Sequence, residues 1–134
     1  MRANLNAAVA CLKIGNDILF NDEKIKVDRI TGHGGLFKTK GVGQRILAAA
    51  LNSPISVMET AGEGGAWGMA LLAGYLVNNH NNLNLPDYLE KEVFAGNTGT
   101  SISPLPEDVA GFNAYIEEYK ACLPIEESAV KFKK

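Results

Sequence analysis

The sequence predicts an α/β fold in which a short parallel sheet of two strands packs with four to five helices. Two segments rich in β-branched residues, 25–31 and 55–58, have the short apolar character of strands. Each is followed by a longer segment with helical periodicity. Because two strands joined through a helix normally pair in parallel, the order strand–helix–strand–helix predicts one βαβ-type unit.

Length and composition are those of one globular domain. The chain has 134 residues, 46% hydrophobic residues and a net charge of −2, which give no electrostatic reason to expect nucleic acid or an anionic membrane as a partner. Cys11 and Cys122 lack the spacing of a zinc site or a disulfide framework. No apolar run approaches the roughly 20 residues that span a bilayer, and no signal peptide is evident. We expect a cytoplasmic protein with two free thiols and no metal site.

Helical periodicity predicts an amphipathic helix at each end of the chain. The first spans residues 4–20, with Asn4 as its N-cap. Its apolar face consists of Leu5, Ala8, Val9, Leu12 and Leu19. The last spans residues 106–123, and two acidic residues in its first turn match the helix dipole. Its buried stripe consists of Val109, Phe112, Ile116, Tyr119 and Leu123.

Three further helices are predicted between these two. The first of them covers residues 39–51 and is capped by Thr39, and its inward side chains are Val42, Ile46, Leu47, Ala50 and Leu51. The others cover residues 62–78 and 86–94. An Asn-rich segment over 78–84 predicts a mobile polar loop in which His80 is solvated, and residues 96–101 predict a second loop.

A glycine turn follows the first strand and is the strongest candidate site. Gly34 and Gly35 carry no side chain that would block a ligand, so backbone N–H groups are left facing whatever binds there. The next helix adds the positive end of its dipole, and the turn is therefore a plausible anion or nucleotide site. The alternative is a tight strand-to-helix connection that binds nothing.

A second glycine-rich segment opens the helix predicted over residues 62–78. Small residues recur along one side of that helix, at Gly64, Ala66, Gly68, Ala70, Ala73 and Gly74. They allow a neighbouring backbone to approach unusually closely. We consider two interpretations: tight packing inside this domain, or close contact with another domain that slides or hinges.

Two strands cannot form a complete sheet, so at least one strand edge is left unpaired. Such an edge invites pairing with another chain. The sequence therefore has the character of a piece of a larger fold, and a homodimer through the exposed strand edge is a second interpretation.

Together, the two motifs resemble the C-terminal half of the FGGY carbohydrate kinases, which include glycerol kinase, xylulokinase and ribulokinase. The Gly34–Gly35 pair followed by a helix bearing Gln44 is similar to the nucleotide turn of that family. The later family pattern Glu-x-x-Ala-x-Gly-x-Ala is filled by Glu63, Ala66, Gly68 and Ala70. The resemblance covers residues 4–123 and implies one lobe of the ribonuclease H-like, actin-like ATPase fold, with residues 1–134 as a single C-terminal nucleotide-binding lobe.

The resemblance also implies roles for individual residues. Gly34 and Gly35 would lie against the adenosine part of ATP through their backbone. Thr39 stands where glycerol-kinase-like members carry an Asn that contacts adenine, and Lys38 would either approach the ATP phosphates or be solvated. The helix from Glu63 through Ala70 would contact the other lobe near the hinge.

The complete enzyme implied by this resemblance transfers the γ-phosphoryl group of ATP, with Mg²⁺, to a sugar hydroxyl. A ketopentose such as ribulose or xylulose is the expected substrate, bound mainly by an N-terminal lobe. The catalytic Asp and the phosphate loops of the family have no counterpart in residues 1–134, so we expect the isolated chain to be inactive. The alternative is a non-catalytic module that binds nucleotide or forms homodimers.

Overall fold

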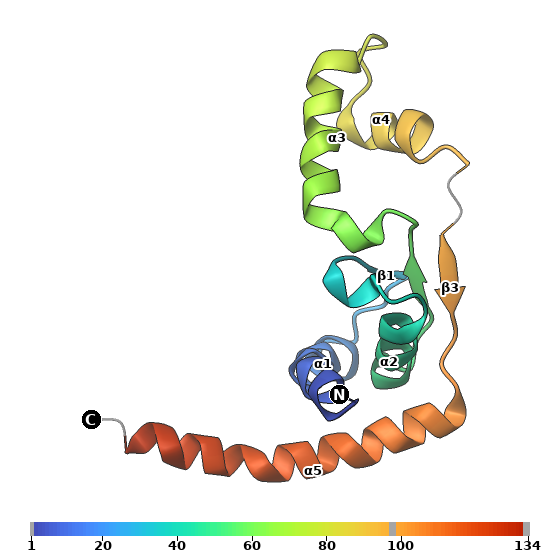
Figure 1. The fold of residues 1–134 in the computed structure, drawn as a ribbon. Helices are drawn as coiled ribbons and strands as arrows, with labels where there is room; N and C mark the ends of the chain where they lie inside the picture. The colour runs from blue at the N-terminus through green and yellow to red at the C-terminus, as the bar shows by residue number, and fades with distance from the viewer. Residues whose placement is uncertain (1, 97–98, 133–134) are drawn as a thin grey trace.

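The computed structural model describes residues 2–96 and 99–132 and has the predicted α/β architecture (Figure 1). In chain order the main elements are α1 (Arg2–Asp17), β1 (Ile30–Gly32), α2 (Val42–Leu51), β2 (Ile55–Val57), α3 (Gly64–Asn78), α4 (Leu85–Tyr88), β3 (Thr100–Ile102) and α5 (Pro106–Lys131). Short 3₁₀ helices occur at Gly35–Phe37 and Ala61–Glu63, and π-helical turns occur at Ile18–Asp22 and Leu89–Val93.

The sheet has three strands in the order β1-β2-β3, one more than the sequence predicts. β1 and β2 are parallel, as expected, with Thr31 opposite Ser56. β3 pairs with β2 in the antiparallel direction, with Ser101 opposite Ser56. The loop prediction for residues 96–101 therefore missed a strand. A three-residue strand carries almost no local signal, and its pairing depends on β2, whose Ser56 lies 45 positions before Ser101 in the sequence.

The first strand is much shorter than predicted. It begins at Ile30 instead of Ile25, and residues 25–29 are exposed. Ile25 and Val27 are 48% and 50% exposed. The β-branched residues of this segment have no strand to pair with in the part of the chain that the structure describes, so their β propensity is not expressed.

The core lies where α2 packs against α1, α5 and β2. Ile55 of β2 is fully buried, and the α2 residues from Leu47 to Leu51 are nearly so. Two predictions for α2 were wrong: Val42 is 40% exposed, and the N-cap is Gly41 in place of Thr39. Gly41 has φ 78°, a left-handed conformation that Thr adopts only with strain.

The bounds and the buried residues of the two terminal helices differ from the predictions. α1 begins at Arg2, so Asn4 lies inside the helix and is not its N-cap. Its buried residues are Val9 and Ala10, whereas Leu12 and Leu19 are 46% and 43% exposed. α5 runs through Pro124 to Lys131 and projects well past α1 (Figure 1). Its apolar stripe is buried at Phe112 and Ile116 but Leu123 is 41% exposed, because α1 no longer covers α5 there.

α3 and α4 form an arm at the end of the sheet opposite α5 (Figure 1). None of the α3 residues is buried. The arm is held together by an edge-on contact between the rings of Tyr75 and Tyr88, with centroids 5.2 Å apart. We define this arm as residues 64–93.

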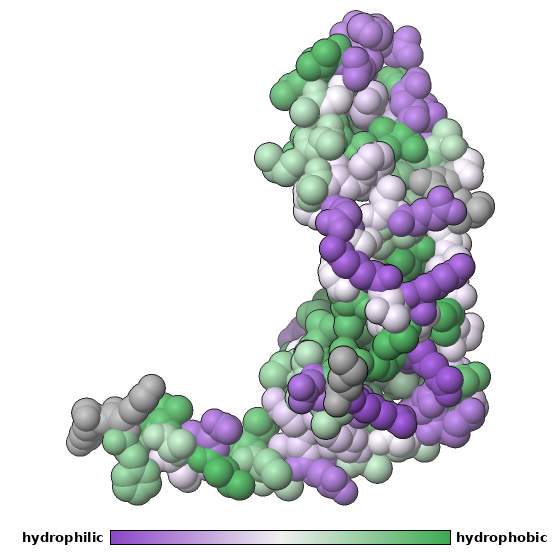
Figure 2. Space-filling model, viewed as in Figure 1, coloured by the Kyte–Doolittle hydropathy of each residue, from purple (hydrophilic) through white to green (hydrophobic). Residues whose placement is uncertain are grey.

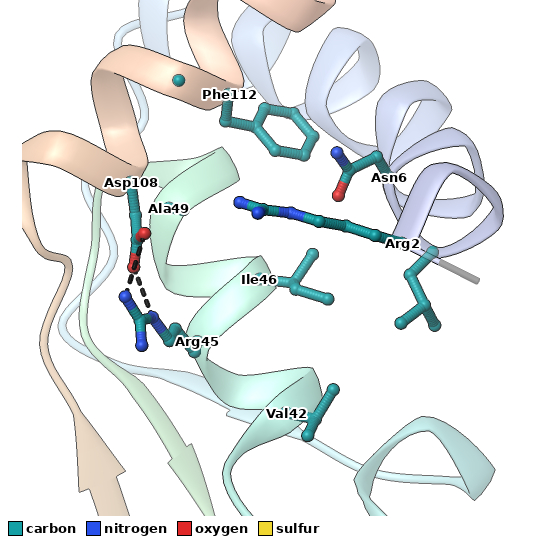
Figure 3. Close-up of a pocket in the computed structure, with 10 residues that line it drawn as sticks. Arg2, Asn6, Val42, Arg45, Ile46, Ala49, Asp108 and Phe112 are labelled. Carbon is teal, nitrogen blue, oxygen red and sulfur yellow. Dashed lines mark hydrogen bonds and ion pairs between the residues drawn. The ribbon is translucent and has the colours of Figure 1, made fainter.

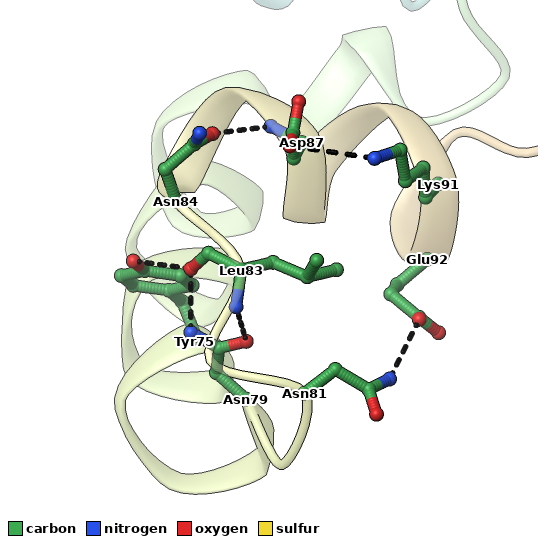
Figure 4. Close-up of polar contacts among 8 residues, drawn as sticks. All are labelled: Tyr75, Asn79, Asn81, Leu83, Asn84, Asp87, Lys91 and Glu92. Atoms are coloured by element: carbon green, nitrogen blue, oxygen red, sulfur yellow. Dashed lines mark hydrogen bonds and ion pairs between the residues drawn. The ribbon is translucent and has the colours of Figure 1, made fainter.

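The Asn-rich loop between α3 and α4 is hydrogen-bonded, although the sequence predicts a mobile segment (Figure 4). Asn79 donates to the carbonyl of Leu83 over 2.7 Å and accepts from its N–H over 2.9 Å. The hydroxyl of Tyr75 donates to the same carbonyl over 2.9 Å, and Asn84 caps α4 by accepting from the N–H of Asp87. His80 is exposed in this loop, as expected.

The long helices do not have the character of membrane spans. Within residues 2–96 and 99–132, no helix is both long enough and apolar enough to cross a bilayer.

Candidate functional site

The two glycine motifs meet at one edge of the sheet. The turn at Gly34 follows β1, and the start of α3 follows β2. Because β1 and β2 are parallel, their carboxyl ends lie side by side, and this edge is where α/β folds commonly bind ligands. The N–H of Gly34 donates to the carbonyl of Ala61 over 2.7 Å and joins the two segments directly.

The turn itself is open. Gly34 has φ 105° and ψ −175°, a backbone conformation reserved for glycine. A Cβ built on Gly34 or on Gly35 would meet no atom within 4 Å. The side chains of this chain therefore do not seal the turn, and the space above both glycines remains accessible.

The hydrogen-bonding capacity of the turn is smaller than the sequence predicts. The N–H of Gly34 is used by Ala61 and is not available to a ligand. The N–H groups of Gly35 and Leu36 are the first in a 3₁₀ helix, and within the described residues neither has an acceptor. These two N–H groups are the backbone donors that the turn offers to an anion or a polar ring.

Lys38 and Glu63 form an ion pair that links the two motifs. The Lys38 Nζ lies 2.6 Å from the Glu63 Oε1. The side chains are 58% and 71% exposed. Because exposed ion pairs contribute little net free energy, this pair opens easily when either partner finds a better contact. The sequence identified both residues as candidates but did not predict that they pair.

Close packing between the two motifs explains why residue 64 is a glycine. A Cβ on Gly64 would lie 3.1 Å from the Cβ of His33, a tighter contact than side chains normally make. Gly64 thus lets the first turn of α3 approach the glycine turn. Thr39, by contrast, is exposed, and only its carbonyl is engaged, as an acceptor for the N–H of Val42 over 3.3 Å.

Gln44 faces inward and not toward the open turn. Its side chain is 4% exposed, and Nε2 donates to the carbonyls of Ile55 and Thr100 over 3.1 and 3.0 Å. The residue therefore ties α2 to β2 and β3. Its contribution to the site is indirect, because it fixes the helix that follows the turn.

The predicted hinge residues lie on or beside an open helix surface. Glu63, Ala66 and Ala70 are exposed, and a Cβ on Gly68 would meet no atom within 4 Å. Of the small residues of α3, Gly64 packs tightly against His33, whereas Gly68 makes no close contact within the described chain. Apolar side chains are exposed along the same arm (Figure 2), at Met69, Leu72, Leu76 and Val77.

Sequence reasoning missed two shielded polar groups that follow β2 in the chain, on Thr60 before α3 and on Trp67 within α3. Among the described residues, neither the Thr60 Oγ1 nor the Trp67 Nε1 has a hydrogen-bond partner, and both atoms are shielded from solvent. Buried polar atoms without partners are uncommon and call for an explanation. The only available signal was the position of Thr60 three residues after the end of β2, and many residues lie close to a strand end.

The described residues form no cluster of metal ligands. Across the residues that the structure describes, no three His, Cys, Asp or Glu side chains gather in a way that would hold a metal ion.

Comparisons with known proteins agree with the motif resemblance. The family model described as "FGGY family of carbohydrate kinases, C-terminal domain" matches residues 1–77, a segment that contains both glycine motifs. The extension of the resemblance to residue 123 stays a prediction. No curated protein and no solved structure matches the chain. The α/β architecture is that of a partial actin-like lobe, as predicted. Because the match covers more than half of the 134 residues, the chain belongs to the FGGY family of carbohydrate kinases, through the C-terminal domain of that family.

Proposed function

We propose that residues 1–134 form a single nucleotide-binding lobe that holds the adenosine part of ATP against the glycine turn. The observation that carries this proposal is the open space above Gly34 and Gly35, at the carboxyl edge of a parallel strand pair, in a chain of a kinase family. An adenosine group needs close backbone approach and a few polar partners. The turn supplies both.

Four residues would contact the nucleotide. The backbone of Gly34 and Gly35 would lie against the adenosine, and the free N–H of Gly35 would donate to it. Thr39 is exposed beside the turn and would contact the adenine. Lys38 would leave Glu63 and approach the phosphates, since a phosphate group is a stronger anionic partner than an exposed carboxylate.

In the complete cytoplasmic enzyme, this lobe would act together with an N-terminal lobe that binds most of the sugar. The proposed reaction transfers the ATP γ-phosphoryl group to a ketopentose such as ribulose or xylulose, and Mg²⁺ would neutralise charge on the phosphates. The α3 surface around Glu63, Ala66, Gly68 and Ala70 would face the other lobe. We expect the 134-residue chain alone to show no turnover with ATP and either ketopentose in a coupled ADP assay.

Calorimetry tests nucleotide binding at the turn. A non-hydrolysable ATP analogue is titrated into the native chain and into Gly35→Val, in which the branched side chain would occupy the open space. We expect at least a tenfold loss of affinity. Gly15→Val in α1 is the matched control, because a Cβ on Gly15 also meets no atom within 4 Å but lies in the first helix. Equal affinity in native protein and Gly35→Val would remove the turn from the site.

A second candidate function is homodimerisation. It is favoured by the exposed apolar residues of α3 and by the outer edge of β1, which among the described residues pairs only with β2. We would measure the mass by light scattering after size exclusion, with Leu76→Glu as a variant on the 83% exposed Leu76. A dimer that this variant dissociates supports the proposal. A monomer at high concentration contradicts it.

A further inference from the structure

A cavity of about 590 Å³ lies away from the glycine turn, where the N-terminal parts of α1 and α5 meet α2 (Figure 3). None of its lining residues belongs to the turn or to α3. Its size is within the range of about 300–1,000 Å³ that is typical of small-molecule sites.

The walls of this cavity are apolar. Leu5 of α1, Ile46 and Ala49 of α2, and Phe112 of α5 are among the apolar residues that line it. The N-terminal parts of α1 and α5 and one face of α2 therefore enclose an apolar hollow that the side chains of the described residues do not fill. Such a surface favours a ligand with a flat or branched hydrocarbon body.

Positive charges outnumber negative charges among the residues that line the cavity. Arg45 binds Asp108 through two hydrogen bonds, from Nε to Oδ2 over 2.5 Å and from Nη2 to Oδ1 over 3.1 Å. Arg2 reaches across the cavity from α1 toward this pair (Figure 3). Within residues 2–96 and 99–132, no carboxylate lies within 4 Å of its guanidinium. Two guanidinium groups and one carboxylate thus leave one net positive charge beside an apolar surface.

We propose that the cavity binds a small monocarboxylate with an apolar body. The carboxylate would accept hydrogen bonds from the Arg2 guanidinium, and the hydrocarbon part would pack between Ile46 and Phe112. A guanidinium binds a carboxylate through two parallel hydrogen bonds. A dianion is disfavoured because Asp108 lies in the same wall. This inference is independent of nucleotide binding at the glycine turn.

The first test compares two ligands that differ only in charge. The ¹⁵N-labelled chain is titrated with 4-phenylbutyrate and, separately, with its neutral amide, 4-phenylbutyramide, without nucleotide. We expect saturable shifts of the backbone amides of Arg45, Ala49 and Gly111, with the carboxylate binding at least fivefold more tightly. Equal affinity for the two ligands, or no saturable shift, would overturn the proposal.

Two variants locate the site. Arg2→Gln should reduce carboxylate affinity to that of the amide. Gly111→Leu should abolish binding of both ligands, because Gly111 lines the cavity and a Cβ there meets no atom within 4 Å. Leu is also a better helix former than Gly, so folding is retained and circular dichroism verifies it.

A third variant controls for net charge. Lys26→Gln removes one exposed positive charge outside the cavity and should bind like the native chain. If Lys26→Gln lowers affinity as much as Arg2→Gln does, the effect is general electrostatics and the proposed site is wrong. Unaltered binding in Gly111→Leu contradicts the location equally.

Discussion

Three glycines around the candidate site differ in whether the fold requires a glycine at their position. Gly34 needs its positive φ of 105°, which other residues adopt only with strain. Gly43 needs to lack a side chain, because a Cβ there would lie 2.7 Å from the carbonyl oxygen of Leu36. Gly35 has neither constraint: its φ is ordinary and the space around it is open. The conformation of the chain does not explain glycine at position 35, whereas a ligand that lies against the backbone would explain it.

The two glycines of the turn should therefore respond differently to the same substitution. Gly34→Ala forces a side chain into a strained conformation and should lower the free energy of unfolding by about 1–3 kcal/mol. Gly35→Ala should leave it unchanged or raise it by up to about 1 kcal/mol, because the unfolded chain loses entropy. Urea denaturation of both variants measures the difference. Equal destabilisation would show that Gly35 is also structurally required.

The ion pair of Arg45 and Asp108 makes folding depend on pH. The hydrogen bond from the Arg45 guanidinium holds the pKa of Asp108 below its ordinary value, although partial burial opposes this shift. The ionised carboxylate therefore stabilises the fold at neutral pH. This contribution persists above the ordinary aspartate pKa and is lost as pH falls through the lowered pKa.

Asp108→Asn tests this linkage. The variant should be less stable than the native chain at pH 7, and the difference in stability should narrow as the pH falls through the lowered pKa of Asp108, where the carboxylate becomes protonated. The urea midpoints of the native chain and the variant, measured at several pH values, give this difference in stability. Asp87→Asn is the control, because Asp87 is a more exposed carboxylate in α4. A gap that stays constant with pH would show that the charge of Asp108 does not stabilise the fold.

At the scale of elements, one buried side chain links α2 to β3, in addition to the pairing of β3 with β2. Gln44 donates to a carbonyl of β2 and to one of β3, and it is the only buried polar or charged residue of the described core. β3 has three residues and only one strand neighbour, so this bond is a large part of what holds it. Contacts of this kind are invisible to periodicity, because they join residues 56 positions apart in the sequence.

Gln44→Leu should therefore loosen β3 more than the rest of the sheet. The substitution keeps the apolar volume but leaves two carbonyls without their donor, at a cost of about 1–3 kcal/mol for each buried group. Hydrogen exchange should accelerate at the β3 amides before it does at β1. If both strands lose protection equally, Gln44 stabilises the core as a whole and not the third strand.

The whole molecule consists of a packed core around α2 and an arm, residues 64–93, that extends away from this core. α2 is surrounded by α1, α5 and the sheet, whereas α3 contributes no buried residue. The arm is stabilised by its own contacts, chiefly the Tyr75–Tyr88 ring pair and the hydrogen bonds around Leu83. An arm with so little buried surface should open without unfolding the core.

Amide hydrogen exchange tests this difference in stability. Amides of α3 from Leu71 to Val77 should exchange with a free energy of opening well below that of the α2 amides around Ala48. The physical reason is that opening the arm exposes few buried groups. In the proposed complete enzyme, contact with the other lobe would slow exchange in α3. Equal protection of α3 and α2 in the isolated chain would show that the arm and core unfold together.

The sequence by itself determined the α/β class, the parallel pairing of the first two strands and the family, because these depend on local periodicity and on glycine motifs that are contiguous in the chain. It also identified Gly34, Gly35, Lys38 and Thr39, whose binding roles stay predictions. The tertiary structure alone decided the third strand, the pairing of Lys38 with Glu63, the inward direction of Gln44, and which parts of the α1 and α5 stripes are buried. Each of these depends on which segment lies opposite, and that information is carried by contacts between distant residues and not by local sequence pattern.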